Sequence, residues 1–279
     1  MVQFMQKELK ELYPATEIRQ FALLIFEHLL GFSSTDLITK GDKSLDEKEL
    51  SFIENCTDRL KKHEPVQYII GETEFLDLKL KVNPSTLIPR PETEELVMWI
   101  AGHINSQHKK VLDIGTGSGC IALGLKAKFP GLDVEAWDIS KEALKTAEQN
   151  AVQNDLEIRF SRVDILTFEP GDEYLQKYDI IISNPPYVTD SEKKLMEKNV
   201  LEHEPHTALF VEDEAPLLFY EKIAGLSRSM LKTGGLLFFE INETMGEKIK
   251  TLLADLGFSE VEIKKDLSGK NRMVKAVNG

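Results

Sequence analysis

The chain has 279 residues, enough for one small and one larger domain, with 42% hydrophobic and 29% charged residues as in ordinary globular proteins. Its net charge of -13 argues against general affinity for duplex nucleic acid, which requires a basic face, and would suit a basic partner. Cys56 and Cys120 cannot frame a disulfide scaffold or a metal site, and neither a signal peptide nor a membrane-length apolar run is present, so we expect a cytoplasmic protein without a metal or a membrane partner.

The first 64 residues are predicted to form helices only. Apolar residues from Ile18 to Leu30 recur at the spacing of one helical face, and Gly31 is expected to end that helix. The stretch Ser44-Leu-Asp-Glu47 has the pattern of a capping box and predicts the start of a second helix. His63 follows two lysines at the end of this helix, which favours a solvated residue over a catalytic one.

Residues 65–86 are predicted to form a β-hairpin that links two domains. Leucines alternate with charged residues from Leu76 to Val82, the pattern of a half-buried strand. Residues 67–70 and the turn at Gly71 would supply its partner strand.

A stiff, proline-braced loop follows, Leu87-Ile-Pro-Arg-Pro-Glu-Thr93, and runs into an apolar helix. Arg90 stands between two prolines, so its backbone has little freedom. A pre-ordered arginine is useful for binding an anionic group, but a rigid linker explains the same residues equally well.

Strands and helices alternate from residue 110 onward. The expected strands are 110–114, 134–137, 158–163, 178–183 and 235–241, with helices at 120–128, 140–152, 215–231 and 244–256, and a terminal hairpin at 261–265 and 273–277. Such a series predicts an α/β fold with a doubly wound, mostly parallel sheet that binds ligands at the carboxyl ends of its strands. The polar, acidic stretch 190–214 is expected to be a flap or a partner surface.

A glycine turn, Asp113-Ile-Gly115-Thr116-Gly117-Ser118-Gly119, follows the first of these strands. Its spacing is not that of a pyrophosphate-binding turn, which argues against a nicotinamide-dependent dehydrogenase.

Three acids lie at the carboxyl ends of three successive strands. Asp113 could face an ammonium group, Asp138 a ribose, and Asp164 with Ile165 an adenine, although Asp138 could also simply cap the next helix. Together they fit an adenosine without phosphate, such as that of S-adenosylmethionine.

The fourth strand ends in Asn184-Pro185-Pro186-Tyr187. Two prolines remove backbone donors, so an amide, free carbonyls and an aromatic ring are left where a buried strand ends. This arrangement indicates a clamp for a small planar group that carries an NH2, although prolines also end strands without any functional role.

The sequence resembles the HemK/PrmC family of class I methyltransferases, which are the protein-(glutamine-N5) methyltransferases of peptide chain release factors. The resemblance covers roughly residues 60–275. It rests on the glycine turn, on Asn184 to Tyr187, and on the segments 64–71, 87–94, Glu204-Pro205 with Ala208-Leu209, and 265–269 with Arg272. It implies a seven-stranded sheet and three parts: a helical substrate-recognition domain (1–64), the hairpin linker (65–86) and an S-adenosylmethionine-dependent methyltransferase domain (87–279).

The resemblance also implies roles for the site residues. Asn184, Pro185 and Tyr187 would be catalytic, and these residues with Pro186 and Arg90 would bind the glutamine of a Gly-Gly-Gln motif. The cofactor would contact Asp113, Gly115 to Gly119, Asp138, Asp164, Ile165 and Asn184. Because an amide nitrogen is a poor nucleophile, the residues would act by positioning it rather than as a strong base.

Three positions depart from the family pattern. Residues 211–215 replace a glycine-rich segment, Asn271 stands where an aspartate is usual, and Ile165 where an aromatic residue is common. The first departure puts the flap conformation in doubt. The alternative function is an N-methyltransferase for adenine or guanine in DNA or RNA, which the acidic balance disfavours; a non-enzymatic binding module would not need Asn184 to Tyr187.

Overall fold

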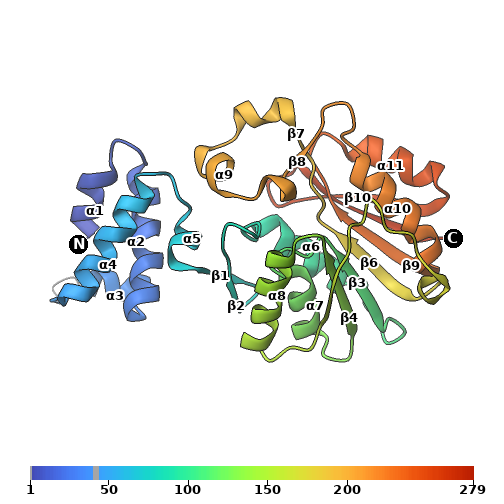
Figure 1. The fold of residues 1–279 in the computed structure, drawn as a ribbon, viewed down its shortest axis with the longest axis horizontal. Helices are drawn as coiled ribbons and strands as arrows, with labels where there is room; N and C mark the ends of the chain where they lie inside the picture. The colour runs from blue at the N-terminus through green and yellow to red at the C-terminus, as the bar shows by residue number, and fades with distance from the viewer. Residues whose placement is uncertain (1, 40–43) are drawn as a thin grey trace. The chain divides into compact units, whose positions relative to one another are not determined.

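The computed structural model describes residues 2–39 and 44–279, which form two compact units (Figure 1). One unit contains Met1–Glu72 with Met196–His203, and the other contains Thr73–Leu195 with Glu204–Gly279. No helix within the described residues is long and apolar enough to span a bilayer.

The smaller unit is helical. It contains α1 (Val2–Leu9), α2 (Ala15–Leu30), α3 (Ser34–Thr39), α4 (Glu47–Leu60), α5 (Val66–Ile70) and α9 (Lys198–His203). Its core includes Met5, Leu9, Ile25, Ile53 and Cys56, all fully buried. As predicted, Gly31 ends α2, and its φ of +66° is one that glycine adopts without strain.

Two sequence predictions in this unit are wrong. Asp46, not Ser44, caps α4: its side chain accepts from the Glu49 amide while Glu49 reaches back to the Asp46 amide. Residues 67–70 form helix α5 rather than a strand, because Pro65 precedes a short helical turn that Gly71 ends at φ +80°. The hairpin therefore begins later, with β1 (Glu72–Phe75) and β2 (Leu78–Lys81).

The larger unit is built on a seven-stranded sheet, as the fold class predicts. Its strands are β3 (Lys110–Ile114), β4 (Asp133–Asp138), β5 (Arg159–Arg162), β6 (Tyr178–Ser183), β9 (Leu231–Glu240), β10 (Phe258–Lys265) and β11 (Asn271–Asn278). Their order is β10-β11-β9-β6-β3-β4-β5, with the pairs from β9 to β5 parallel and β11 antiparallel to both neighbours. The chain runs from β3 to β4 and then β5 on one side of β3, and it crosses back after β5 to place β6 on the other side.

Helices cover both faces of this sheet (Figure 1). They are α6 (Pro91–Ala101), α7 (Cys120–Lys128) and α8 (Lys141–Gln153) on one face and α10 (Leu218–Met230) and α11 (Gly246–Asp255) on the other. The central strands are buried on both sides: Ile180 and Ile182 pack into one core, and Ile181 packs into the other. Phe75 and Leu80 of the hairpin join the first core.

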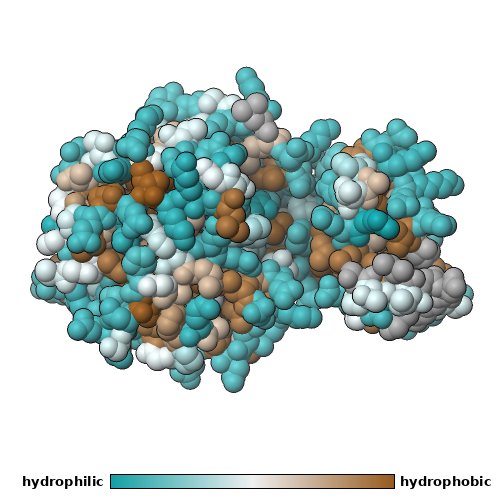
Figure 2. Space-filling view, turned by 180° about the vertical axis from the view of Figure 1, so that it is seen from behind, coloured by the Kyte–Doolittle hydropathy of each residue, from teal (hydrophilic) through white to brown (hydrophobic). Residues whose placement is uncertain are grey.

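The predicted flap, 190–214, contains a 3-10 turn (Asp190–Leu195), α9, a second 3-10 turn (His206–Ala208) and β8 (Phe210–Val211), and β7 (Val188–Thr189) directly precedes it. Strands β7 and β8 pair in parallel, so the start and the end of the flap lie together. On the face of the molecule shown in Figure 2, hydrophilic residues predominate and apolar ones are scattered, in keeping with the charged content of 29%.

Candidate active site

A cavity of about 380 Å³ lies at the carboxyl ends of β3, β4 and β6 in the larger unit. This is the point where the strand order reverses, because β3 has β4 on one side and β6 on the other. Open parallel sheets bind ligands at such a switch point, and the volume is in the range of small-molecule sites.

The glycine turn forms one wall of the cavity. Gly115, Gly117 and Gly119 have φ of +75°, +56° and +84°, so all three occupy the left-handed region that favours glycine. A Cβ at Gly119 would also lie 3.2 Å from the Ala147 Cβ, which shows how closely the turn approaches α8. Gly115 and Gly117 line the cavity and leave bare backbone toward it.

Asp138 lies across the turn and lines the cavity. Its Oδ2 accepts from the Gly117 amide and its Oδ1 from the Ser140 amide, both at 2.8 Å. Burial raises the pKa of this carboxyl, and the same backbone amides oppose the rise. The N-cap of α8 is Ser140, whose side chain accepts from the Ala143 amide. Asp138 contributes to the start of this helix only by accepting from the Ser140 amide.

Asp113 lies apart from the cavity wall that the other two acids share. It is fully buried, its Oδ2 accepts from Thr116 Oγ1 at 2.6 Å, and it is not among the lining residues. Burial raises its pKa to about 7. Among the described residues, its Oδ1 and the nearby Ser118 Oγ have no hydrogen-bond partner. Two orphaned buried polar atoms at an open turn fit a ligand that brings its own polar groups.

Asp164 and Ile165 line the cavity beyond the end of β5. Asp164 Oδ1 accepts from the Leu166 amide at 3.1 Å, so the acid also shapes its own loop. The isoleucine supplies an apolar surface at the same wall, together with Val163 and Ile139.

Of the clamp residues Asn184 to Tyr187, the first three line the cavity and the last packs into the core. Asn184, Pro185 and Pro186 line the cavity, and no described residue donates a hydrogen bond to the Asn184 side chain or the Pro185 carbonyl. Tyr187 does not line it; its ring packs against the second core and its hydroxyl lies 3.4 Å from Glu240 Oε1.

Arg90 is paired with a buried acid rather than held free. Its Nη2 lies 2.5 Å from Oε1 of Glu204, whose side chain is 1% exposed, and the other oxygen of Glu204 accepts from the Ile88 amide. Glu204 precedes the flap residues Thr207, Ala208 and Phe210, which line the cavity. The ion pair thus joins the proline-braced loop to the flap.

The sequence assigned no role at the site to Glu204, Thr93 or Glu240, although Glu204 and Thr93 lie in segments that carry the family resemblance. Thr93 lines the cavity and donates from Oγ1 to Glu240 Oε2 at 2.7 Å, and Glu240 ends β9. An acid at the carboxyl end of a parallel strand was the signal used for Asp113, Asp138 and Asp164, and the same signal marks Glu240.

Two family descriptions match the chain. The Methyltransferase small domain matches residues 96–209, and the PrmC N-terminal domain matches residues 1–71.

Close relatives match over nearly the full length. A release factor glutamine methyltransferase of Flavobacterium psychrophilum is 46% identical over 98% of this chain and 96% of that protein. A release factor glutamine methyltransferase of Bacteroides thetaiotaomicron is 43% identical over 98% of this chain and 97% of that protein. Among solved structures, a methyltransferase from Pyrococcus furiosus has a TM-score of 0.51 at 21% identity, covering 72% of this chain and 89% of that one, a likeness of fold.

Proposed function

The chain belongs to the release factor glutamine methyltransferase family, and from this premise we propose that it methylates the side-chain amide nitrogen (N5) of the Gly-Gly-Gln glutamine in peptide chain release factors. The methyl donor we propose is S-adenosylmethionine. The observation that carries the proposal is the free Asn184 amide and Pro185 carbonyl at the cavity wall, next to a glycine turn with orphaned polar atoms.

The donor supplies a methyl group made electrophilic by its sulfonium. On the protein side, Gly115 and Gly117 would let the ligand lie against bare backbone, and Asp138 would accept from the ribose hydroxyls. Each Asp138 oxygen already accepts one amide and keeps a second lone pair for this purpose. Asp164 and Ile165 would contact the adenine, and Asp113, beneath the turn, would stabilise a positively charged amino group.

The acceptor amide would be held by Asn184 and Pro185. Their side-chain and backbone carbonyl oxygens would each accept one of its N–H bonds, which orients the nitrogen lone pair and favours the positive charge that develops on it. Pro185 and Pro186, which follow Asn184, would keep these acceptors in place, since they limit the backbone directly after the end of β6. After transfer the amide nitrogen loses a proton to solvent.

For Arg90 we propose the structural one of the two roles that the sequence left open. Its pairing with Glu204 supports a part in holding the loop and flap around the substrate, in place of direct contact with an anionic group. We also propose that the helical residues of the smaller unit contact the release factor and that the enzyme acts in the cytoplasm.

The test is incubation of the purified chain with labelled S-adenosylmethionine and one acceptor at a time: unmodified release factor, DNA or rRNA. We expect label only on the release factor, and a mass increase of one methyl group on the peptide that carries the Gly-Gly-Gln glutamine. Label on nucleic acid alone would refute the proposal and favour the nucleobase alternative.

A further inference from the structure

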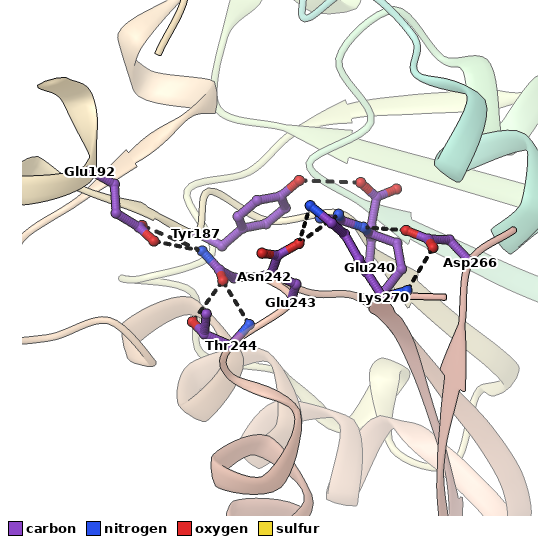
Figure 3. A network of polar contacts seen from close by, with 9 residues as sticks. Tyr187, Glu192, Glu240, Asn242, Glu243, Thr244, Asp266 and Lys270 are labelled. Carbon is purple, nitrogen blue, oxygen red and sulfur yellow. Dashed lines mark hydrogen bonds and ion pairs between the residues drawn. The ribbon is translucent and has the colours of Figure 1, made fainter. Parts of the chain in front are cut away.

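Glu240 links two segments that border the cavity. It is the last residue of β9, the parallel neighbour of β6, and is 1% exposed. Its Oε2 accepts from Thr93 Oγ1 at 2.7 Å and its Oε1 from the Tyr187 hydroxyl at 3.4 Å (Figure 3 shows the contact with Tyr187). Thr93 ends the proline-braced loop and lies in the first turn of α6, and Tyr187 is the last residue of the clamp sequence.

A second contact from the end of β9 holds the chain that follows the clamp. The Asn242 side-chain amide donates to both Glu192 oxygens, at 3.3 and 3.4 Å (Figure 3). Glu192 also accepts from the Thr189 backbone amide at 2.9 Å. Glu240 and Asn242 therefore fix the segment from Tyr187 to Glu192 from one short stretch of backbone.

Within the part of the chain that the structure describes, Glu240 has no direct ion pair. Arg272 of β11 is the cation nearby, but among the described residues it pairs with Asp266 at 3.3 Å and with Glu243 at 3.7 Å. Burial, together with the negative charge of Glu92, raises the pKa of Glu240 to about 7, and the Thr93 hydroxyl, Arg272 and the Tyr187 hydroxyl limit the rise. Both protonation states are thus accessible near neutral pH.

The ionised and the protonated form of the Glu240 carboxyl differ in the hydrogen bonds that they make. An ionised carboxylate accepts charge-assisted hydrogen bonds from both hydroxyls, whereas a protonated one has lost its negative charge and carries a hydrogen on one oxygen, so its hold on the two hydroxyls is weaker. Among the described residues, the part of the clamp that hydrogen-bonds to the Glu240 side chain is the Tyr187 hydroxyl, and Tyr187 directly follows Pro186, which lines the cavity.

Resting on the proposed methyl transfer, we propose that ionised Glu240 is a positioning residue, which fixes Tyr187 and through it the Asn184 to Pro186 clamp around the acceptor nitrogen. Since an amide is a weak nucleophile, the rate depends on its alignment, and a clamp that moves loses rate without losing the methyl donor.

The test compares Glu240→Gln, Tyr187→Phe and the double variant. We expect Glu240→Gln to lower kcat about tenfold to a hundredfold, the size of a lost hydrogen bond to a charged group, while calorimetry shows unchanged affinity for S-adenosylmethionine. The double variant should be no slower than the slower single variant, because both changes remove the same link. Glu247→Gln, the same change at an exposed site on α11, should leave kcat unchanged.

The pH profile separates positioning from general support of the fold. The wild-type kcat should fall as the pH drops through about 7, and Glu240→Gln should lack this acid limb because its amide does not titrate. An acid limb unchanged in Glu240→Gln, a wild-type kcat in that variant, or additive losses in the double variant would each overturn the inference.

The comparison does not depend on which acceptor the enzyme uses or on whether Glu240→Gln folds. The acceptor is whichever molecule the wild-type chain methylates, so failure of the release-factor proposal changes the acceptor and leaves the Glu240 comparison intact. Where circular dichroism shows that Glu240→Gln does not fold, the profile of Tyr187→Phe decides: loss of the acid limb supports the inference, and its persistence refutes it.

Discussion

The pair Arg90–Glu204 allows a direct test of whether Arg90 serves the fold or the substrate. Arg90→Ala would leave the Glu204 carboxylate, 1% exposed, with the Ile88 amide at 3.5 Å as its hydrogen-bond partner among the described residues. Removing one partner of a fully buried pair costs about 3–5 kcal/mol, but the Arg90 side chain is 35% exposed, so water replaces part of the lost interaction. We therefore expect a loss of about 2 kcal/mol.

A loss of this size lowers Tm by about 4–8 °C in a domain of 150–250 residues. Differential scanning calorimetry would measure it, with Arg19→Ala, the same change on the exposed side of α2, as a control that leaves Tm unchanged. The double variant Arg90→Ala with Glu204→Gln should recover part of the loss, because the buried charge is gone. If Arg90→Ala has the Tm of the wild type and a raised KM for the protein acceptor, the structural role is refuted and Arg90 binds the substrate.

Three further predictions concern the cavity. Asn184→Ala should reduce methyl transfer at least about a hundredfold with cofactor affinity spared; retained activity contradicts the clamp. Asp138→Ala should weaken S-adenosylmethionine binding about tenfold to a hundredfold in calorimetry, and unchanged affinity contradicts the ribose contact. Burial raises the pKa of Asp113 from 3.8 to about 7, so the folded chain holds a proton that the unfolded chain releases, and stability falls as pH rises between these values. In urea unfolding, Asp113→Asn should therefore be more stable than the wild type at pH 8 but not at pH 4. If the free energies of unfolding of the two proteins change with pH in the same way, the prediction is contradicted.

The order of strands and helices could be predicted from the sequence because their hydrophobic patterns are local. Lys110 to Ile114 and Tyr178 to Ser183 appear where their apolar runs predict. The errors arise where two local signals compete. Ser44 and Asp46 each have a glutamate three residues later, and only Asp46 forms the capping box.

The side-chain contacts that hold the site together could not be predicted from the sequence, because they join residues far apart in the chain. Arg90 and Glu204 are 114 residues apart, and Thr93 and Glu240 are 147 apart. No local pattern in the sequence predicts such pairs, since each depends on how distant segments of the chain come together in the fold. The clamp residues themselves were visible because two consecutive prolines at a strand end are unusual in any context.

The position of β11 has a consequence for folding during synthesis. This strand follows β10 in the chain yet lies between β9 and β10, so β9 has no antiparallel neighbour until residues 271–278 have left the ribosome. Until then the fully apolar run Leu236 to Phe239 presents an unpaired strand edge, which is a template for pairing with another nascent chain. The nascent enzyme is therefore most exposed to aggregation in the interval between the emergence of β9 and that of β11.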